Sequence, residues 1–393
     1  MNIRAVLLLP LLVAFMGLVG CQTLFGVGSD AYSLSYLERP SWTPERIDSA
    51  EGVLDYLTSY PDEFSLVAYW TDAPERGVYH NADTPRPLAS TMKVLVLVEY
   101  ARQVEAGNLD PAERVPLDSI DVYYVPLTDG GAHRQALAVH RTEDGTVALD
   151  EVARMMIRFS SNAATDYLIA RLGRDAVLRS PERAGASSSD APLPLSGLFG
   201  GTNARGAPVL PDEAFERAAR LRSSPGYRRG QRFWQVLAPI RLSYFEQRRN
   251  SDVLPAGTAA DYAGLMARAY EGTLVSDSVS AYVRSVLEWP MLYGWSQDRF
   301  ESYGIKGGSV AGVLTRTMYA RPKADARGPA GGREPGSGVV VALFVQGLPR
   351  HVFEAWHWGT PFADFTTRIM LDPEFFERVR TEIATAAPPQ SPR

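Results

Sequence analysis

The alternation of apolar and polar residues predicts β-strands near both ends of this chain. Phe64–Trp70 alternates like a half-buried strand, and residues 77–79 can form its hairpin partner. Residues 310–319 and Val339–Val345 are apolar and β-branched, and the Gly- and Pro-rich segment between them predicts a long-looped antiparallel hairpin. Neither pair is stable alone, so we expect the early and late strands to share one sheet.

The middle and the end of the chain show helical periodicity instead. Residues 92–104 are apolar on nearly all sides, which predicts a helix buried over most of its surface. Other helices are expected from 43 onward and at 151–159, 162–172, 259–270, 277–289, 362–371 and 373–384. Residues 174–250 give no assignable pattern, and residues 386–393 are predicted to be a disordered tail.

These elements predict an α/β (α+β) fold with one domain at residues 43–385. An antiparallel sheet flanked by helices would combine the early and late strands. An all-helical lobe, from about residue 100 to residue 290, would be inserted between them.

Composition restricts the possible functions. The chain has 393 residues, of which 45% are hydrophobic and 22% charged, as in ordinary globular proteins. Its net charge of −5 and the lack of a basic run argue against a nucleic-acid partner. The single cysteine, Cys21, excludes a disulfide framework, and the five histidines show no metal-binding spacing. We therefore expect structural histidines and no cofactor.

Residues 1–20 have the features of a signal peptide, with an apolar run at 5–18 that is too short for a comfortable membrane span. The run ends in Leu-Val-Gly-Cys at residues 18–21, which resembles the lipobox of bacterial lipoproteins. The resemblance implies an extracytoplasmic protein held at the cell membrane by a lipid on Cys21, with residues 21–42 as a tether. An uncleaved N-terminal anchor helix is the alternative.

Lysine is rare in this chain, and the positions of two of the lysines suggest catalytic roles. Of 40 Lys and Arg residues only three are lysine, namely Lys93, Lys306 and Lys323. Arginine stays charged, whereas a desolvated lysine can lose its proton and act as a base. Lys93 and Lys306 stand in short motifs, while Lys323 lies in a predicted loop. A general compositional bias towards arginine is the alternative explanation.

The first motif is Ser90-Thr-Met-Lys93, at the start of the apolar helix. One helical turn separates the two side chains, so they lie on one face. A serine hydroxyl needs a base to become a nucleophile, and a buried lysine amine is a candidate for that base. The backbone N–H of Ser90 can also stabilise an oxyanion. The motif alone is weak, but an apolar helix makes a solvated surface lysine a poor explanation.

Two further motifs carry polar groups of the kind that acyl transfer needs. Ser160-Ser161-Asn162 lies between two predicted helices, where Ser160 can relay a proton and Asn162 can hold a substrate carbonyl. A simple helix cap is the alternative. Residues 306–309, Lys-Gly-Gly-Ser, open the first late strand. There Lys306 can face a substrate carboxylate, Gly307 and Gly308 can admit a substrate backbone, and the Ser309 N–H can complete an oxyanion hole.

Together these motifs resemble the S-x-x-K, S-D-N and K-T-G signature of serine β-lactamases and penicillin-binding proteins. The segments around Ser90 and at 159–166 most resemble the class A β-lactamase catalytic domain. The resemblance implies the β-lactamase/transpeptidase-like fold, Ser90 as the acylated nucleophile and Lys93 as its base. It also implies a small-molecule substrate, either a β-lactam or a cell-wall peptide.

The chain departs from the family pattern at three places. Ser161 replaces the aspartate of S-D-N, and Gly307 replaces the threonine of K-T-G. The family's deacylating glutamate, in an E-x-x-L-N loop, has no counterpart, because residues 192–199 occupy about that place without an acid. The candidates for a substitute acid, by proximity in sequence alone, are Glu182, Asp212, Glu213 and Glu216. The sequence therefore predicts acylation followed by slow deacylation.

The long segment 174–250 suggests an additional helical flap over the site, with Phe233, Trp234 and Tyr244 as apolar contacts.

Three functions remain open on the sequence alone. The first is a serine acyl-hydrolase acting on β-lactams. The second is a D,D-peptidase or esterase of the same fold, and the third is a non-catalytic binding lipoprotein.

Overall fold

The computed structural model describes residues 38–140, 142–199, 209–236, 243–324 and 337–386. The predicted signal peptide at 1–20, Cys21, most of the predicted tether and the tail from 387 lie outside these residues. Within the described part of the chain, no helix is both long and apolar enough to cross a membrane.

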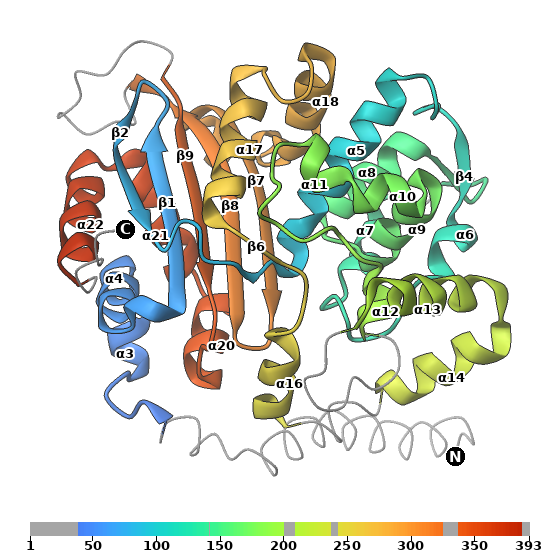
Figure 1. The fold of residues 1–393 in the computed structure, drawn as a ribbon, viewed down its shortest axis with the longest axis horizontal. Helices are drawn as coiled ribbons and strands as arrows, with labels where there is room; N and C mark the ends of the chain where they lie inside the picture. The colour runs from blue at the N-terminus through green and yellow to red at the C-terminus, as the bar shows by residue number, and fades with distance from the viewer. Residues whose placement is uncertain (1–37, 141, 200–208, 237–242, 325–336, 387–393) are drawn as a thin grey trace, which may run out of the picture.

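The centre of the molecule is a five-stranded antiparallel sheet (Figure 1). Its strand order is β2-β1-β9-β8-β7. The strands are β1 (Phe64–Trp70), β2 (Ala73–His80), β7 (Phe300–Val310), β8 (Val313–Pro322) and β9 (Val339–Val345). β1 pairs with β9 over its whole length, from Phe64 opposite Val345 to Trp70 opposite Val339. The prediction that early and late strands share one sheet is confirmed.

The prediction of one strand at 310–319 was wrong, because this region forms the end of one strand and most of the next. β7 and β8 form a hairpin whose turn contains Gly312 at φ +75°. Gly304, Gly307 and Gly308 interrupt the alternating pattern of β7 and hid it in the sequence. Consequently Lys306 lies in the interior of an edge strand and does not open it.

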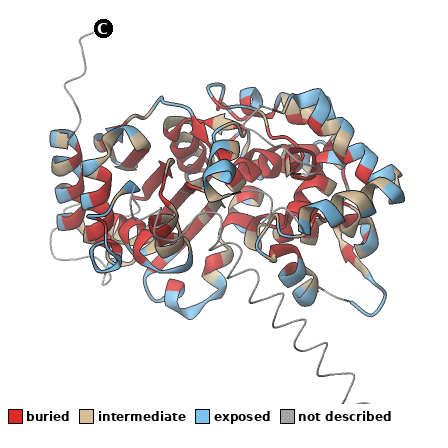
Figure 2. Ribbon diagram, turned by 90° about the horizontal axis from the view of Figure 1, so that it is seen from below, coloured by how far each residue is buried: buried red, intermediate tan, exposed pale blue. Residues whose placement is uncertain are grey.

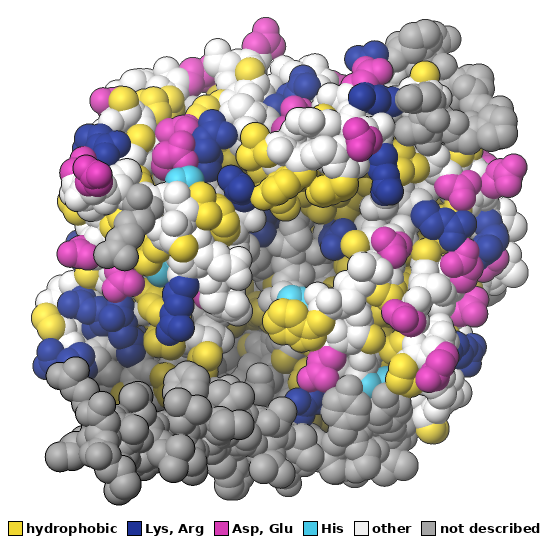
Figure 3. Space-filling view, turned by 180° about the vertical axis from the view of Figure 1, so that it is seen from behind, with side chains coloured by type: hydrophobic (Ala, Val, Ile, Leu, Met, Phe, Trp, Pro, Cys, Tyr) yellow, Lys and Arg dark blue, Asp and Glu magenta, His cyan; other side chains and the backbone are white. Residues whose placement is uncertain are grey.

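Helices from the two ends of the chain cover one face of the sheet and enclose one hydrophobic core (Figure 2). They are α3 (Pro44–Ile47), α4 (Ala50–Ser59), α20 (Arg350–Trp358), α21 (Pro361–Leu371) and α22 (Pro373–Ala386). The sequence patterns predicted α21 and α22 and a single helix where α3 and α4 form, and they did not predict α20. Mixed acidic and basic side chains cover much of the face seen from behind in Figure 3.

The predicted helical lobe packs against the other face and contains the second core. Its first helices are α5 (Lys93–Glu105), α6 (Leu117–Asp121), α7 (Ala132–His140), α8 (Leu149–Arg158), α9 (Asn162–Leu172), α10 (Arg174–Leu178) and α11 (Ser180–Arg183). The later ones are α12 (Leu195–Phe199), α13 (Pro211–Ser223), α14 (Pro225–Val236), α16 (Tyr244–Ser251), α17 (Ala259–Glu271), α18 (Asp277–Leu287) and α19 (Gly294–Gln297). Short 3₁₀ segments are η1 (Pro61–Glu63), η2 (Ala89–Met92) and η3 (Trp289–Leu292).

Two small strand pairs interrupt the helical lobe. β3 (Arg86–Pro87) pairs with β6 (Ala256–Gly257), and β4 (Arg114–Pro116) pairs with β5 (Thr146–Ala148). Neither pair was predicted, because two or three residues are too few to show an alternating pattern.

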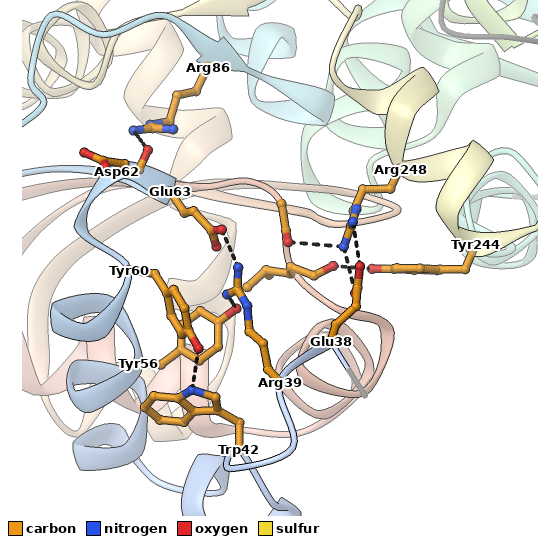
Figure 4. A network of polar contacts seen from close by, with 12 residues as sticks. Glu38, Arg39, Trp42, Tyr56, Tyr60, Asp62, Glu63, Arg86, Tyr244 and Arg248 are labelled. Atoms are coloured by element: carbon orange, nitrogen blue, oxygen red, sulfur yellow. Dashed lines mark hydrogen bonds and ion pairs between the residues drawn. The ribbon is translucent and has the colours of Figure 1, made fainter. Parts of the chain in front are cut away.

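Residues 38–42, which precede the predicted domain boundary at residue 43, contact the body of the protein. Trp42 is buried, and Arg39 donates hydrogen bonds to Tyr56 and Glu63 (Figure 4). Glu38 forms an ion pair with Arg248 on α16, at 2.9 Å. The first described residues are therefore held to the body of the protein and do not belong to a free tether.

Candidate active site

Ser90 lies in the 3₁₀ turn η2, immediately before the long buried helix α5. Ala89 just before it has φ +47°, a conformation that non-glycine residues rarely adopt and that often occurs at functional sites. The neighbouring Thr91 fixes the turn, because its hydroxyl contacts Thr315 Oγ1 on β8 at 2.6 Å and donates to the Leu88 carbonyl. Ser90 itself is only partly buried and lines a small cleft.

Lys93 is completely buried, one turn after Ser90. Its Nζ lies 2.6 Å from the Ser160 carbonyl oxygen, 3.0 Å from Ser160 Oγ and 2.8 Å from Asn162 Oδ1. Burial lowers the pKa of Lys93 well below its usual value, and the nearby positive charge of Lys306 lowers it further. This lowering of the pKa favours the neutral amine that a general base requires.

Ser160 connects the two lysines that the sequence singled out. Its Oγ is 3.0 Å from Lys93 Nζ and 3.1 Å from Lys306 Nζ. The turn that places it is unusual, since Ser160 has φ +65°. A hydroxyl has two acceptor lone pairs and one donor proton. When both lone pairs accept from lysines, the proton of Ser160 is left to donate to another group.

Asn162 is the first residue of α9, and both ends of its amide are engaged. The oxygen accepts from Lys93, while Nδ2 donates to the Thr128 carbonyl at 3.0 Å. Thr128 and Asn162 both line the cleft. The amide therefore holds Lys93 in position and lies where a substrate would contact it.

The Lys306-Gly307-Gly308-Ser309 motif brings the edge strand β7 against η2. A Cβ atom on Gly308 would lie 2.6 Å from the Ser90 backbone nitrogen, so only glycine permits this close approach. A Cβ on Gly307 would meet its nearest atom, the Thr315 carbonyl oxygen, at 3.5 Å, which is ordinary contact. Ser309 lines the cleft beside Ser90. The pKa of Lys306 is lowered to about 7 by burial.

Two residues near this cluster were not recognised from the sequence. His133, on α7, is fully buried and its Nδ1 lies 2.9 Å from Ser161 Oγ. Ser161 Oγ also accepts from the Ala164 N–H and caps α9. Arg316 lies opposite Gly307 in the β7–β8 ladder. The His133–Ser161 contact joins two helices, and the position of Arg316 depends on the β7–β8 register, so no motif spacing could reveal either of them.

The segment expected to hold a deacylating acid forms one wall of the cleft. Leu195, Leu198 and Phe199 of α12 all line the cleft, and all three are apolar. The carboxylate of Asp166 caps this helix, accepting from the backbone N–H groups of Leu195 and Ser196, both at 2.7 Å. Burial raises the pKa of Asp166 to about 6. Both of its oxygens are occupied, so Asp166 holds α12 in place.

The substitute acids proposed from the sequence do not reach the cleft. Glu182, Asp212, Glu213 and Glu216 are exposed, and none of them lines it. Asp212 pairs with Arg174 and Glu213 with Arg217. Proximity along the chain was misleading because α11 turns Glu182, and α13 turns the other three side chains, towards solvent.

The predicted apolar flap is also wrong in its residues. Phe233 and Trp234 are exposed on α14, and neither lines the cleft. Tyr244 donates to the Leu348 carbonyl at 3.0 Å, on the sheet side of the molecule. The helix that borders the cleft is α12, which the sequence patterns did not assign.

In the part of the chain that the structure describes, no group of three or more His, Cys, Asp or Glu side chains is arranged to hold a metal ion. The chemistry visible in the cluster is that of a nucleophilic serine, two desolvated amines and a bridging hydroxyl. This set fits acyl transfer, in which protons move between the nucleophile, a base and a leaving group.

Comparisons with known proteins point the same way. A family model described as "Beta-lactamase enzyme family" matches residues 49–292, which include Ser90, Lys93 and Ser160. The Lys306 motif lies beyond the matched segment, and the fold brings it into contact with Ser160 within that segment. A search of curated protein sequences gave no match.

Solved structures of similar fold have low sequence identity to this chain. A β-lactamase from Sphaerobacter thermophilus DSM 20745 has a TM-score of 0.50 at 19% identity, covering 86% of this chain and 98% of that one. A class A β-lactamase from Mycobacterium abscessus has a TM-score of 0.47 at 15% identity, covering 81% and 98%. A point mutant of PBP-A, in an acyl-enzyme complex with penicillin G, has a TM-score of 0.47 at 14% identity, covering 82% and 96%.

Proposed function

Because the chain belongs to the β-lactamase enzyme family, we propose that this serine hydrolase opens β-lactam rings through an acyl-enzyme on Ser90. We further propose that the acyl-enzyme is hydrolysed slowly. The observation that carries the proposal is the Ser160 hydroxyl, which lies within hydrogen-bond distance of both buried lysines. A non-catalytic binding protein has no need of two desolvated amines around one hydroxyl.

Acylation begins at Lys93. A neutral amine has two N–H groups and one lone pair, and two acceptor-only atoms, the Ser160 carbonyl and Asn162 Oδ1, take the two N–H groups. The lone pair is then left for a hydroxyl proton. As Ser90 Oγ bonds to the lactam carbonyl carbon, its proton passes to Lys93. Catalytic hydrogen bonds often tighten only when substrate is bound, so this contact forms in the complex.

The lactam C–N bond breaks in the second half of acylation. The negative oxygen of the tetrahedral intermediate accepts from the N–H groups of Ser90 and Ser309. The leaving nitrogen takes the Ser160 hydroxyl proton, and one of the two protonated lysines replaces that proton. The product is an ester of Ser90, which a water molecule must later hydrolyse.

Slow hydrolysis follows from the composition of α12. Leu195-Ser-Gly-Leu-Phe199 has the spacing of the E-x-x-L-N motif, with Leu195 in place of the glutamate. Leu195 lines the cleft and cannot activate water. The buried Asp166 nearby does not line the cleft, and its two oxygens accept from the backbone N–H groups that begin α12.

The same apolar wall favours a second candidate function. An enzyme that transfers or hydrolyses cell-wall peptides or esters can work without rapid hydrolysis of a penicilloyl ester. We therefore keep a D,D-peptidase or esterase activity as the alternative, for which slow β-lactam turnover would be incidental.

Covalent labelling with a fluorescent penicillin, followed by turnover of a chromogenic cephalosporin, tests the proposal. We expect labelling in wild type and none in Ser90→Ala, with slow cephalosporin turnover. Labelling without any turnover would favour the peptidase or esterase. No labelling of a folded wild-type protein would contradict both functions.

We also propose that the protein is an extracytoplasmic lipoprotein anchored through Cys21. This rests on the lipobox-like residues 18–21 and on the lack of any other cysteine. Cys21→Ser should prevent lipidation and processing and leave a larger precursor. An unchanged size and unchanged membrane attachment would support an uncleaved anchor instead.

A further inference from the structure

The helices α14 and α16 present aromatic and basic side chains that the cleft does not use. Phe233 and Trp234 on α14 are 61% and 49% exposed, and Phe245 on α16 is 50% exposed. Arg229 and Arg249 on the same two helices are exposed as well. We call these five residues the α14–α16 surface.

Both helices are firmly attached, so this surface has a fixed position on the protein. On α14, Arg232 donates to the carbonyls of Asp121 and Tyr124 at 2.6 and 3.0 Å, and Arg228 donates to the Leu221 carbonyl at 2.6 Å. On α16, Tyr244 donates to the Leu348 carbonyl. The exposed aromatic residues of α14 and α16 therefore stand on helices that these hydrogen bonds hold to the rest of the protein.

The charge of the surface is positive. α14 contains three arginines and no acidic residue. α16 contains two arginines and one acidic residue, Glu246, whose carboxylate keeps its charge and lies near Arg249, so the two helices together still carry a positive net charge. Exposed arginines beside exposed Phe and Trp are typical of segments that lie at a membrane interface, with arginines at anionic headgroups and aromatic rings below them.

The chain enters the folded body at the same end of the molecule. Glu38, the first described residue, pairs with Arg248 on α16 (Figure 4), and α14 and α16 share one end of the molecule (Figure 1). Sixteen residues separate Cys21 from Glu38. They can span at most roughly 55 Å. A membrane attachment at the N-terminus therefore keeps this end of the protein near the bilayer.

We propose that the α14–α16 surface binds an anionic phospholipid bilayer. The aromatic rings enter the headgroup region, and Arg229 and Arg249 contact lipid phosphates. This inference rests on the proposed attachment of the N-terminus and is independent of the proposed catalysis. Attachment makes the contact intramolecular, so individually weak contacts suffice to orient the protein.

The test uses the full chain with Cys21→Ser, so that an introduced cysteine is the only thiol. The apolar run at 5–18 remains and still attaches the chain to the membrane. An environment-sensitive fluorophore is placed on Gln235→Cys in α14. The matched control carries the same fluorophore on Val275→Cys, in the turn between α17 and α18 at the opposite end of the molecule (Figure 1). Both proteins are reconstituted into vesicles of phosphatidylglycerol and phosphatidylcholine that contain a lipid-borne nitroxide quencher.

We expect several-fold stronger quenching at position 235 than at position 275. The difference should shrink at high salt, in phosphatidylcholine alone and in the Arg229→Gln/Arg249→Gln variant, because the attraction is partly electrostatic. Phe233→Ser with Trp234→Ser should reduce it further.

Equal quenching at the two positions would overturn the proposal. So would a fluorescence change at 235 that appears without vesicles and grows with protein concentration, since α14 would then contact a second copy of the chain. Penicillin labelling of the same samples reports whether the fold and the catalytic serine are intact, which separates failure of this inference from failure of the proposed function.

Discussion

The amine of Lys306, a residue in the interior of the edge strand β7, lies 3.1 Å from the hydroxyl of Ser160. Burial brings the pKa of Lys306 to about 7, so its charge changes within the physiological range. In its protonated form this one side chain can attract an anionic substrate and supply a proton to Ser160, and both abilities are lost as the pH rises through that value.

This relationship predicts a pH dependence that differs between substrates. Below about pH 7 the free enzyme carries a charged Lys306, which attracts a substrate carboxylate. We expect kcat/KM for a penicillin to fall as pH rises through that value, because kcat/KM reports the free enzyme. A neutral ester, which has no carboxylate for Lys306 to attract, should show a smaller alkaline fall. An identical profile for both substrates would remove the carboxylate-binding role of Lys306.

Burial of Lys306 also predicts a gain in stability on its replacement. The unfolded chain binds a proton at Lys306 up to its ordinary pKa of 10.5, whereas the folded chain releases it near 7. Wild-type stability should therefore rise with pH between these values, and the full penalty applies below about pH 7.

Lys306→Met should raise the free energy of unfolding by on the order of 1–4 kcal/mol, the range found for replacing buried charges by apolar residues. The gain should be largest below about pH 7 and decline towards alkaline pH. Denaturant unfolding at several pH values measures it. A loss of stability at every pH would show that the amine contributes more to the fold than its burial costs.

Exchange of lysine for arginine tests whether the rarity of lysine reflects chemistry. Lys93→Arg should lower the acylation rate nearly as much as Ser90→Ala, because guanidinium cannot accept the hydroxyl proton. General-base assistance contributes roughly 100- to 10,000-fold. Lys323→Arg is the matched control and should change nothing. Small and equal effects of the Lys93 and Lys323 exchanges would mean that composition alone explains the pattern.

Two adjacent glycines of β7 should respond differently to alanine. Gly308→Ala places a methyl group against the Ser90 nitrogen and should displace η2, lowering both acylation and thermal stability. Gly307→Ala meets only ordinary contacts and should leave the fold intact. Stopped-flow acylation and thermal melts compare them. Equal tolerance of both changes would refute the close approach of β7 to the nucleophile.

Much of the fold could be predicted because its elements carry regular patterns. β9 is a continuous apolar strand, and α9 ends at Gly173 with φ +86°, where the sequence predicted its end. β1 forms where it was predicted, but it is buried along nearly its whole length, Ser65 included, and not half-buried as its alternation indicated. β7 was missed because its three glycines interrupt the alternating pattern of a strand. α12 was missed because it has only five residues and depends on a cap from the distant Asp166.

The candidate site was predictable only where its residues form local motifs. Ser90, Lys93, Ser160, Asn162 and Lys306 stand in short motifs, and the structure brings them together. The contact between His133 and Ser161 joins two helices and has no local signal. The sequence predicted that the deacylating acid is missing. Which apolar residues line the cleft in its place became evident only from the structure.

The central claim is that Ser90 forms an acyl-enzyme that persists because Leu195 replaces a deacylating acid. Intact-mass spectrometry during a time course with penicillin G, with peptide mapping of Ser90, measures this directly. We predict one added penicillin mass per chain, located on Ser90, that accumulates within the first turnover and decays slowly. In Leu195→Glu the same adduct should decay faster. Turnover of penicillin without any accumulated adduct, or an adduct on a residue other than Ser90, would contradict the account.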